Sequence, residues 1–288
     1  MPENHDEIAA RQKPPPGALF LDHISHFVPD LDPAARLLEA LGFAVTPLSV
    51  QVTPDGPVGS SNRCVMLESG YLEILTPTLD TPVARQMRDR IDRYVGVHLA
   101  CFGTPSADDE HARLSARGFD PLPVVRLARQ VEDGATVRFN VVRVPPAKMP
   151  EGRIQFVEQL APECIWRAAH LAHDNGVTGL AAVYAVAADP GEVAARYARF
   201  SGLLPRREGE FTCLASDRGE VRIGTRETLA RLFGEAPLAP ALAGYALSCR
   251  DPAAFAARCR DAGLAVSGRD SRYFVLLPPA LGGAWVLQ

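Results

Sequence analysis

The feature that most constrains the fold is a pattern that occurs four times along the 288 residues. Each copy has a strand-like apolar run, a turn, an amphipathic helix, and a glycine followed by Phe or Leu. Three of the helices begin at Asp-Pro, where Asp caps the first free amides and Pro fits the first helical position. A glycine just beyond a helix can adopt the left-handed conformation that ends it. Four copies in one order predict a repeated structural unit. The closing glycines are Gly42, Gly118, Gly202 and Gly263.

Short strand-like runs follow every helix, so each unit reads as βαβββ and the chain as α+β. A polar start that ends in Lys-Pro-Pro-Pro predicts a flexible tail at 1–17. The first pair of units is expected at 18–161, a connector at 162–176, and the second pair at 177–288. The runs after the helices are 61–67, 71–76, 136–144, 154–160, 210–215, 220–224, 273–277 and 284–287.

Charge and composition exclude several classes of function. The net charge is −4 and the chain has no long Lys/Arg run, so nucleic acid is not an expected partner. It also lacks an apolar run of transmembrane length and the apolar core of a secretory signal. The six cysteines form no C-x-x-C pair and predict reduced, buried thiols. We therefore expect a cytoplasmic protein that acts on a small molecule.

Four polar residues occupy matching strands of the first two units. His23 and His98 lie in the opening strands, whereas Glu73 and Gln155 lie in closing strands. If the two units pack around a pseudo-two-fold axis, these four side chains would converge. Two imidazoles, a carboxylate and an amide oxygen suit a divalent transition metal. A carboxylate buried as deeply as that of Glu73 would also need a metal or a raised pKa to be tolerated.

Arginines gather in the middle strands of the second unit. Two interpretations stay open: these strands present a solvated face, or one of the arginines faces the site. In the second case Arg138 or Arg126 would bind a substrate carboxylate or phosphate, because the planar guanidinium matches such groups. Asn140 would share the face of Arg138 and join it. The cluster comprises Arg126, Arg129, Arg138 and Arg143.

The segments 21–24 (LDHI), 32–42, 71–74 (YLEI) and 96–99 (GVHL) carry a resemblance to a known superfamily. The chain resembles the vicinal oxygen chelate superfamily of glyoxalases, extradiol dioxygenases and fosfomycin-resistance proteins, and more closely its glyoxalase-like domain proteins. The resemblance implies that each pair of modules forms a cupped, open-barrel mixed sheet flanked by helices. It also implies that His23, Glu73, His98 and Gln155 hold a divalent metal ion: Zn, Ni, Co, Mn or Fe. Gln155 departs from the common pattern of two His and two Glu. The opening strands of the second pair carry no such ligands, so that pair is expected to be degenerate.

These expectations combine into one predicted function. The chain would be a metal-dependent lyase, isomerase or epimerase that acts on a small oxygenated metabolite through a metal-stabilised enolate, with Glu73 as the base. Two alternatives stay open. The first is an Fe(II)-dependent extradiol-type dioxygenase that uses His23, His98 and Glu73. The second is a non-catalytic small-molecule-binding protein of the resistance type. Pairing of modules within one chain leaves homodimer formation open.

Overall fold

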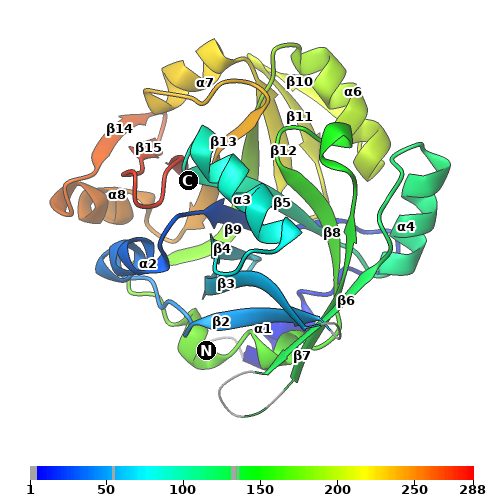
Figure 1. The fold of residues 1–288 in the computed structure, drawn as a ribbon. Coiled ribbons are helices and arrows are strands. Elements are labelled where there is room, and N and C mark those ends of the chain that lie inside the picture. Colours follow the sequence, from blue (N-terminus) through cyan, green and yellow to red (C-terminus); the bar gives the residue numbers. More distant parts are fainter. Residues whose placement is uncertain (1–4, 54–55, 131–133, 135) are drawn as a thin grey trace.

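The computed structural model describes residues 5–53, 56–130, 134 and 136–288, and its first half contains a closed eight-stranded barrel (Figure 1). The barrel closes where β2 meets β6 through the pair Val52 and Ala128. Strands β1 and β5 open the two modules and pair antiparallel, while each pairs in parallel with the closing strand of its own module. In order around the barrel the strands are β1 (Phe20–Phe27), β4 (Tyr71–Pro77), β3 (Gly56–Met66), β2 (Ser49–Thr53), β6 (Val125–Gln130), β7 (Thr136–Arg143), β8 (Arg153–Gln159) and β5 (Gly96–Gly103).

The second half repeats this strand order in an eight-stranded sheet that stays open. Its central strands β9 and β13 pair antiparallel, as β1 and β5 do in the barrel. In order the strands are β10 (Pro205–Glu208), β11 (Phe211–Ala215), β12 (Glu220–Gly224), β9 (Val177–Val186), β13 (Ala241–Cys249), β16 (Ala284–Leu287), β15 (Arg272–Leu276) and β14 (Ala265–Arg269). The predicted α+β fold of paired modules is therefore confirmed.

Helices connect the strands of both sheets and pack against them. The four closing glycines all have a positive φ, between 74° and 84°, which confirms their predicted role. Asp189 and Asp251 cap their helices as expected, but Asp30 and Ser106 cap the first two. The helices are α1 (His5–Ala10), α2 (Leu31–Ala40), α3 (Pro82–Arg93), α4 (Ala107–Ala116), α5 (Ala168–Leu171), α6 (Pro190–Ser201), α7 (Arg226–Phe233) and α8 (Pro252–Asp261), with 3₁₀ turns at Pro146–Lys148 and Pro162–Cys164.

Within the expected flexible tail, the described residues are instead packed against the barrel. Helix α1 buries Ile8 in an apolar cluster that also contains Trp166 of the connector. Gln12 is fully buried, and its amide nitrogen donates hydrogen bonds to the carbonyl oxygens of Ile8 (2.8 Å) and Glu68 (3.0 Å). A polar composition indicated exposure here, but one apolar residue and one satisfied amide hold the segment in place.

The two sheets pack against each other through the faces of their central strands. Ile24 of β1 and Val183 of β9 belong to one continuous apolar core. His26 also crosses this contact, because its Nδ1 lies 2.9 Å from the carbonyl oxygen of Leu281 and its Nε2 lies 2.9 Å from the hydroxyl of Tyr245. The opposite face of β1 and β5 is thereby directed into the barrel. Among the helices that the structure describes, none is long and apolar enough to cross a membrane.

The inner faces of the two sheets are filled differently. In the second sheet α7 packs Leu229 and Phe233 onto a floor that contains Tyr184 and several alanines. In the barrel, the corresponding helix α3 reaches an apolar cluster at one end only, through Met87. Space lined by polar groups therefore persists in the barrel.

Candidate functional site: a polar pocket inside the barrel

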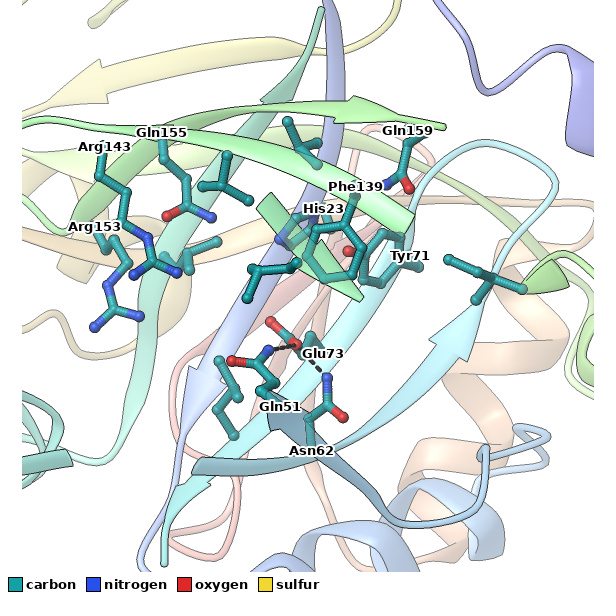
Figure 2. A pocket seen from close by; sticks show the side chains of 16 residues that line it. His23, Gln51, Asn62, Tyr71, Glu73, Phe139, Arg143, Arg153, Gln155 and Gln159 are labelled. Carbon is teal, nitrogen blue, oxygen red and sulfur yellow. Dashed lines mark hydrogen bonds between the residues drawn. The ribbon is translucent and has the colours of Figure 1, made fainter. Parts of the chain in front are cut away.

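A pocket inside the barrel brings together three of the four residues proposed as metal ligands. His23 of β1, Glu73 of β4 and Gln155 of β8 all line it, and each is about 5% exposed or less (Figure 2). The cavity measures about 30 Å³, roughly the space of one water molecule, so a larger ligand needs lining side chains to rotate. The other lining residues are Gln51, Asn62, Tyr71, Leu75, Leu99, Leu127, Phe139, Val141, Arg143, Arg153, Val157, Gln159 and Ile165.

Neutral donors surround the buried carboxylate of Glu73. The Ser25 hydroxyl donates to Oε2 and the Asn62 amide to Oε1, each at 2.5 Å, and the Gln51 amide lies 3.4 Å from Oε1. These side chains come from β1, β2 and β3, so three strands hold the carboxylate in place. Such hydrogen bonds compensate the desolvation of a buried carboxylate without requiring a metal.

His23 forms a buried pair with the residue before it. Its Nδ1 lies 2.6 Å from Oδ1 of Asp22, which is fully buried, and its ring stacks on Tyr71 at 4.3 Å. Burial alone would lower the pKa of His23, but the Cys101 sulfur and the Asp22 carboxylate outweigh it and raise the pKa well above its usual value. We attribute the shift chiefly to Asp22, because an adjacent carboxylate favours the imidazolium. The arrangement therefore favours the imidazolium form of His23, paired with the Asp22 carboxylate.

The structure does not bring His98 to the other three residues. Its side chain leaves β5 on the opposite face, where the ring stacks on Tyr94 at 4.0 Å and Nε2 lies 2.7 Å from the Tyr94 carbonyl oxygen. Burial, followed by the positive charges of Arg90 and Arg93, lowers the pKa of His98 to about 3. The expected convergence of four side chains is therefore wrong for His98, which belongs to the packing outside the barrel.

The strand pairing shows why His98 faces outward. His23 pairs with Cys101 and Ser25 pairs with Leu99, so Leu99 shares the inward side of the ladder and His98, its neighbour in β5, faces the other way. Leu99 pairs with Arg153 in the way that His23 pairs with Tyr71. The structural counterpart of His23 is thus an apolar leucine, one residue beyond the histidine that the sequence motif indicated.

The three proposed substrate-binding residues lie on the outer face of the barrel. Arg138 is exposed, Arg126 approaches Asp108 of α4 at 3.4 Å, and the Asn140 amide donates to Glu158 at 2.8 Å. Of the two interpretations, the outer face is therefore right for Arg138 and Arg126, and the alternative in which they face the cup with Asn140 is wrong. The side chain of Arg129 lies outside the described part of the structure.

Two other arginines face the pocket: Arg143, which belonged to the predicted cluster but was not one of the named candidates, and Arg153, which was missed. Arg143 ends β7 and Arg153 begins β8, and Figure 2 shows them beside Gln155 at one end of the pocket. A signal for Arg143 was present in the sequence, because it continues the alternation of Val137, Phe139 and Val141, whose side chains face inward. Burial, then the proximity of Arg143 and Arg90, lowers the pKa of Arg153 to about 9.

The donor set does not fit the four-ligand metal site of the related enzymes. Leu99 replaces the second histidine, Asp22 holds one nitrogen of His23, and Glu73 already accepts hydrogen bonds from its neighbours. Elsewhere in the described residues, Glu208, Cys213 and Glu220 of the second sheet bring potential ligand atoms together. Arg222 binds both of those carboxylates, at 2.9 Å and 2.5 Å, so ion pairing accounts for this group.

Comparison with known proteins places the chain in a family. The model of the glyoxalase-like domain family matches residues 21–201. The chain belongs to this family and is a glyoxalase-like protein of the vicinal oxygen chelate superfamily, whose members generally use divalent metals. No curated protein matches the sequence.

Solved structures show the same fold at low sequence identity. A hypothetical protein from Staphylococcus aureus is 11% identical, with a TM-score of 0.64 over 94% of this chain and 99% of that one. A fusion of a xylose isomerase-like TIM barrel with a 4-hydroxyphenylpyruvate dioxygenase gives a TM-score of 0.56 at 10% identity, over 95% of this chain and 50% of that one. A mutant of 4-hydroxymandelate synthase from Streptomyces coelicolor gives 0.52 at 15% identity, over 94% and 92%.

Proposed function

We propose that the chain is an enzyme that moves a proton within a small oxygenated metabolite bound in the barrel, as an isomerase, epimerase or lyase. The observation that carries the proposal is that the hydrogen-bonded carboxyl group of Glu73 and the ring of His23, which Asp22 holds through Nδ1, line one pocket. An acid and a base with opposed charges in one pocket form the arrangement that general acid–base catalysis requires.

In the proposed reaction, Glu73 is the base. It takes a proton from the carbon next to a carbonyl group; the electron pair of that C–H bond forms the C=C bond of the enolate, and the π pair of the carbonyl moves to the oxygen. His23 donates a hydrogen bond to this oxygen through Nε2, the ring nitrogen that Asp22 does not hold. Return of the proton to another carbon, or to the other face, gives the isomer or epimer. The imidazolium thus supplies the positive charge that stabilises the enolate.

Two features support this reading over the dioxygenase alternative. An iron site of two histidines and one carboxylate would need His98, whose ring lies outside the barrel and on Tyr94. The hydrogen bonds from Ser25 and Asn62 fix the position of the Glu73 carboxyl group in the pocket, as a base requires.

The experiment is solvent deuterium exchange, because enolate formation exchanges the C–H proton whatever the final product. The protein is incubated in D₂O with a panel of 2-oxo, 3-oxo and 2-hydroxy acids, and loss of the C–H signal is followed by proton NMR. We expect exchange with the wild type, loss with Glu73→Gln, and retention with His98→Asn, a buried histidine outside the pocket. Exchange that is absent across the panel, or equal in Glu73→Gln, would contradict the proposal.

A chelator arm tests the charge that stabilises the enolate. We expect exchange to survive treatment with EDTA and to decrease in His23→Gln, which removes the imidazolium. Loss of exchange with EDTA, restored by one of Zn, Ni, Co, Mn or Fe, would instead establish a metal-dependent reaction. Metal content measured by mass spectrometry on a sample without a His-tag accompanies both arms.

A further inference from the structure

A second cavity adjoins the pocket, between α3 and the connection from β7 to β8. It measures about 140 Å³ and shares Arg143 and Arg153 with the pocket inside the barrel. Arg90 of α3 also lines it. The remaining lining residues are Val83, Gln86, Leu122, Val144, Pro146, Met149, Gly152 and Ile154.

The three guanidinium groups lack an ion-pair partner in the described structure, and only the Glu73 carboxylate of the adjoining pocket offsets part of the charge of Arg143 and Arg153. Among the residues that the structure describes, no carboxylate lines this cavity, and no ion pair involves any of the three arginines. The Nε of Arg143 is buried without a hydrogen-bond partner. Arg153 lies over the ring of Phe27 at 5.4 Å, a contact that orients its guanidinium but does not cancel its charge.

Positive charges packed in this way are unfavourable without an anion. Desolvation disfavours the charged form of a guanidinium, and burial lowers the pKa of each of the three arginines; the charges of Arg143 and Arg90 lower that of Arg153 further. A guanidinium has fixed, planar donors that match the oxygen atoms of a carboxylate or phosphate. An oxyanion between them would supply the missing acceptors and offset the repulsion.

We propose that this cavity is a binding site for the oxyanion group of a small amphipathic molecule, a carboxylate or a phosphate ester. Arg143 and Arg153 contact the oxygen atoms and Arg90 closes the site from α3. The apolar side chains around the arginines contact a short apolar body. Because the two arginines also line the barrel pocket, their movement toward an anion opens the wall between the two spaces. The proposal does not depend on the chemistry of Glu73 and is tested without turnover.

The test measures stabilisation by simple anions. Thermal unfolding of the full chain is followed with inorganic phosphate and, separately, with butyrate, each against sodium chloride at the same ionic strength. We expect a saturable rise in Tm with at least one of the two anions, because a ligand that binds only the native state stabilises it. The anion that acts at the lower concentration distinguishes phosphate from carboxylate recognition.

Variants assign the effect to the cavity. Arg143→Met and Arg90→Met each remove one charge and keep an apolar side chain of similar reach, and we expect each to weaken anion binding roughly tenfold or more. Without anion, the same variants should unfold at an equal or higher Tm than the wild type, because repulsion is relieved. Arg138→Met is the matched control, since Arg138 lies on the same strand as Arg143 but is exposed on the outer face.

Two results would overturn the proposal. The first is a wild type that gains no more from phosphate or butyrate than from chloride. The second is equal stabilisation of the wild type, Arg143→Met and Arg90→Met, which would place the bound anion elsewhere. Glu73→Gln should keep anion binding, so failure of the proposed proton transfer and failure of this site give different results.

Discussion

His26 makes the contact between the two sheets sensitive to acid. The carbonyl oxygen of Leu281 can only accept a hydrogen bond, so Nδ1 of His26 carries the proton and Nε2 accepts from the hydroxyl of Tyr245. Protonation of the second nitrogen would break this arrangement inside the core. Burial, which exceeds the opposing effect of the backbone hydrogen bonds, lowers the pKa of His26 to about 4.

The sign and size of the effect follow from proton linkage. Between pH 6.5 and 4 the histidine is protonated in the unfolded chain, where its pKa is about 6.5, but it stays neutral in the native state. The contribution of His26 to stability is therefore complete above pH 6.5 and decreases as the pH falls. Relative to pH 8, it amounts to a loss of about 2 kcal/mol at pH 5 and levels off near 3 kcal/mol below pH 4.

The assay compares urea unfolding of the wild type and His26→Gln at pH 8 and pH 5. Glutamine keeps a donor and an acceptor but cannot titrate. We expect the free energy of unfolding of the wild type to fall by about 2 kcal/mol more than that of the variant. NMR titration of the His26 ring should give the low pKa directly. Equal losses in the two proteins, or a ring that titrates near pH 6.5, would refute the reasoning.

Three further contacts are tested by denaturant unfolding with four substitutions, one of which is a control. Glu151→Gln should lower the free energy of unfolding by about 3–5 kcal/mol, because Arg196 loses its fully buried carboxylate partner at 2.8 Å. The control Glu192→Gln removes the exposed carboxylate partner of the same arginine and should lower it by less than about 1 kcal/mol. Similar losses in the two variants would contradict the greater contribution of the buried pair. Gly282→Ala should cost about 3 kcal/mol, since φ is +68° and the added Cβ would lie 2.0 Å from a backbone oxygen; an unchanged midpoint would show that this turn yields. Trp166→Phe should cost about 1–3 kcal/mol through the loss of a buried N–H···O bond of 2.9 Å, and no change would mean that water replaces the donor.

The repeat was readable from the sequence because its signals are local. A capping side chain, a helix and a glycine with positive φ act within a few residues, so Gly42 and Gly118 could be assigned without knowledge of the partner strands. The same holds for the inward direction of His23 and Glu73, which begin and end one module. Local signals therefore define each βαβββ module, and the repetition of that module predicts most of the fold.

The part of the site that could not be predicted depends on pairing between distant strands. Whether His98 or Leu99 faces inward is decided by the register between β1 and β5, which pairs Ser25 with Leu99, and nothing near His98 in the sequence marks that register. In β7 both faces carry apolar and polar residues, because one lines a pocket and the other meets α4. Arg138 and Arg143 could therefore not be told apart by polarity alone.

The filled inner face of the second sheet makes a specific target for engineering. Helix α7 inserts Phe233 against Tyr184 at 5.3 Å between ring centres, above a floor of small side chains. The substitution Phe233→Ala would leave a cavity lined by apolar side chains. Cavities of this kind contain no water and can bind benzene or xenon. The chain would then contain two separate binding sites, an apolar one beside α7 and the proposed anion site beside α3, and each could bind its ligand independently of the other.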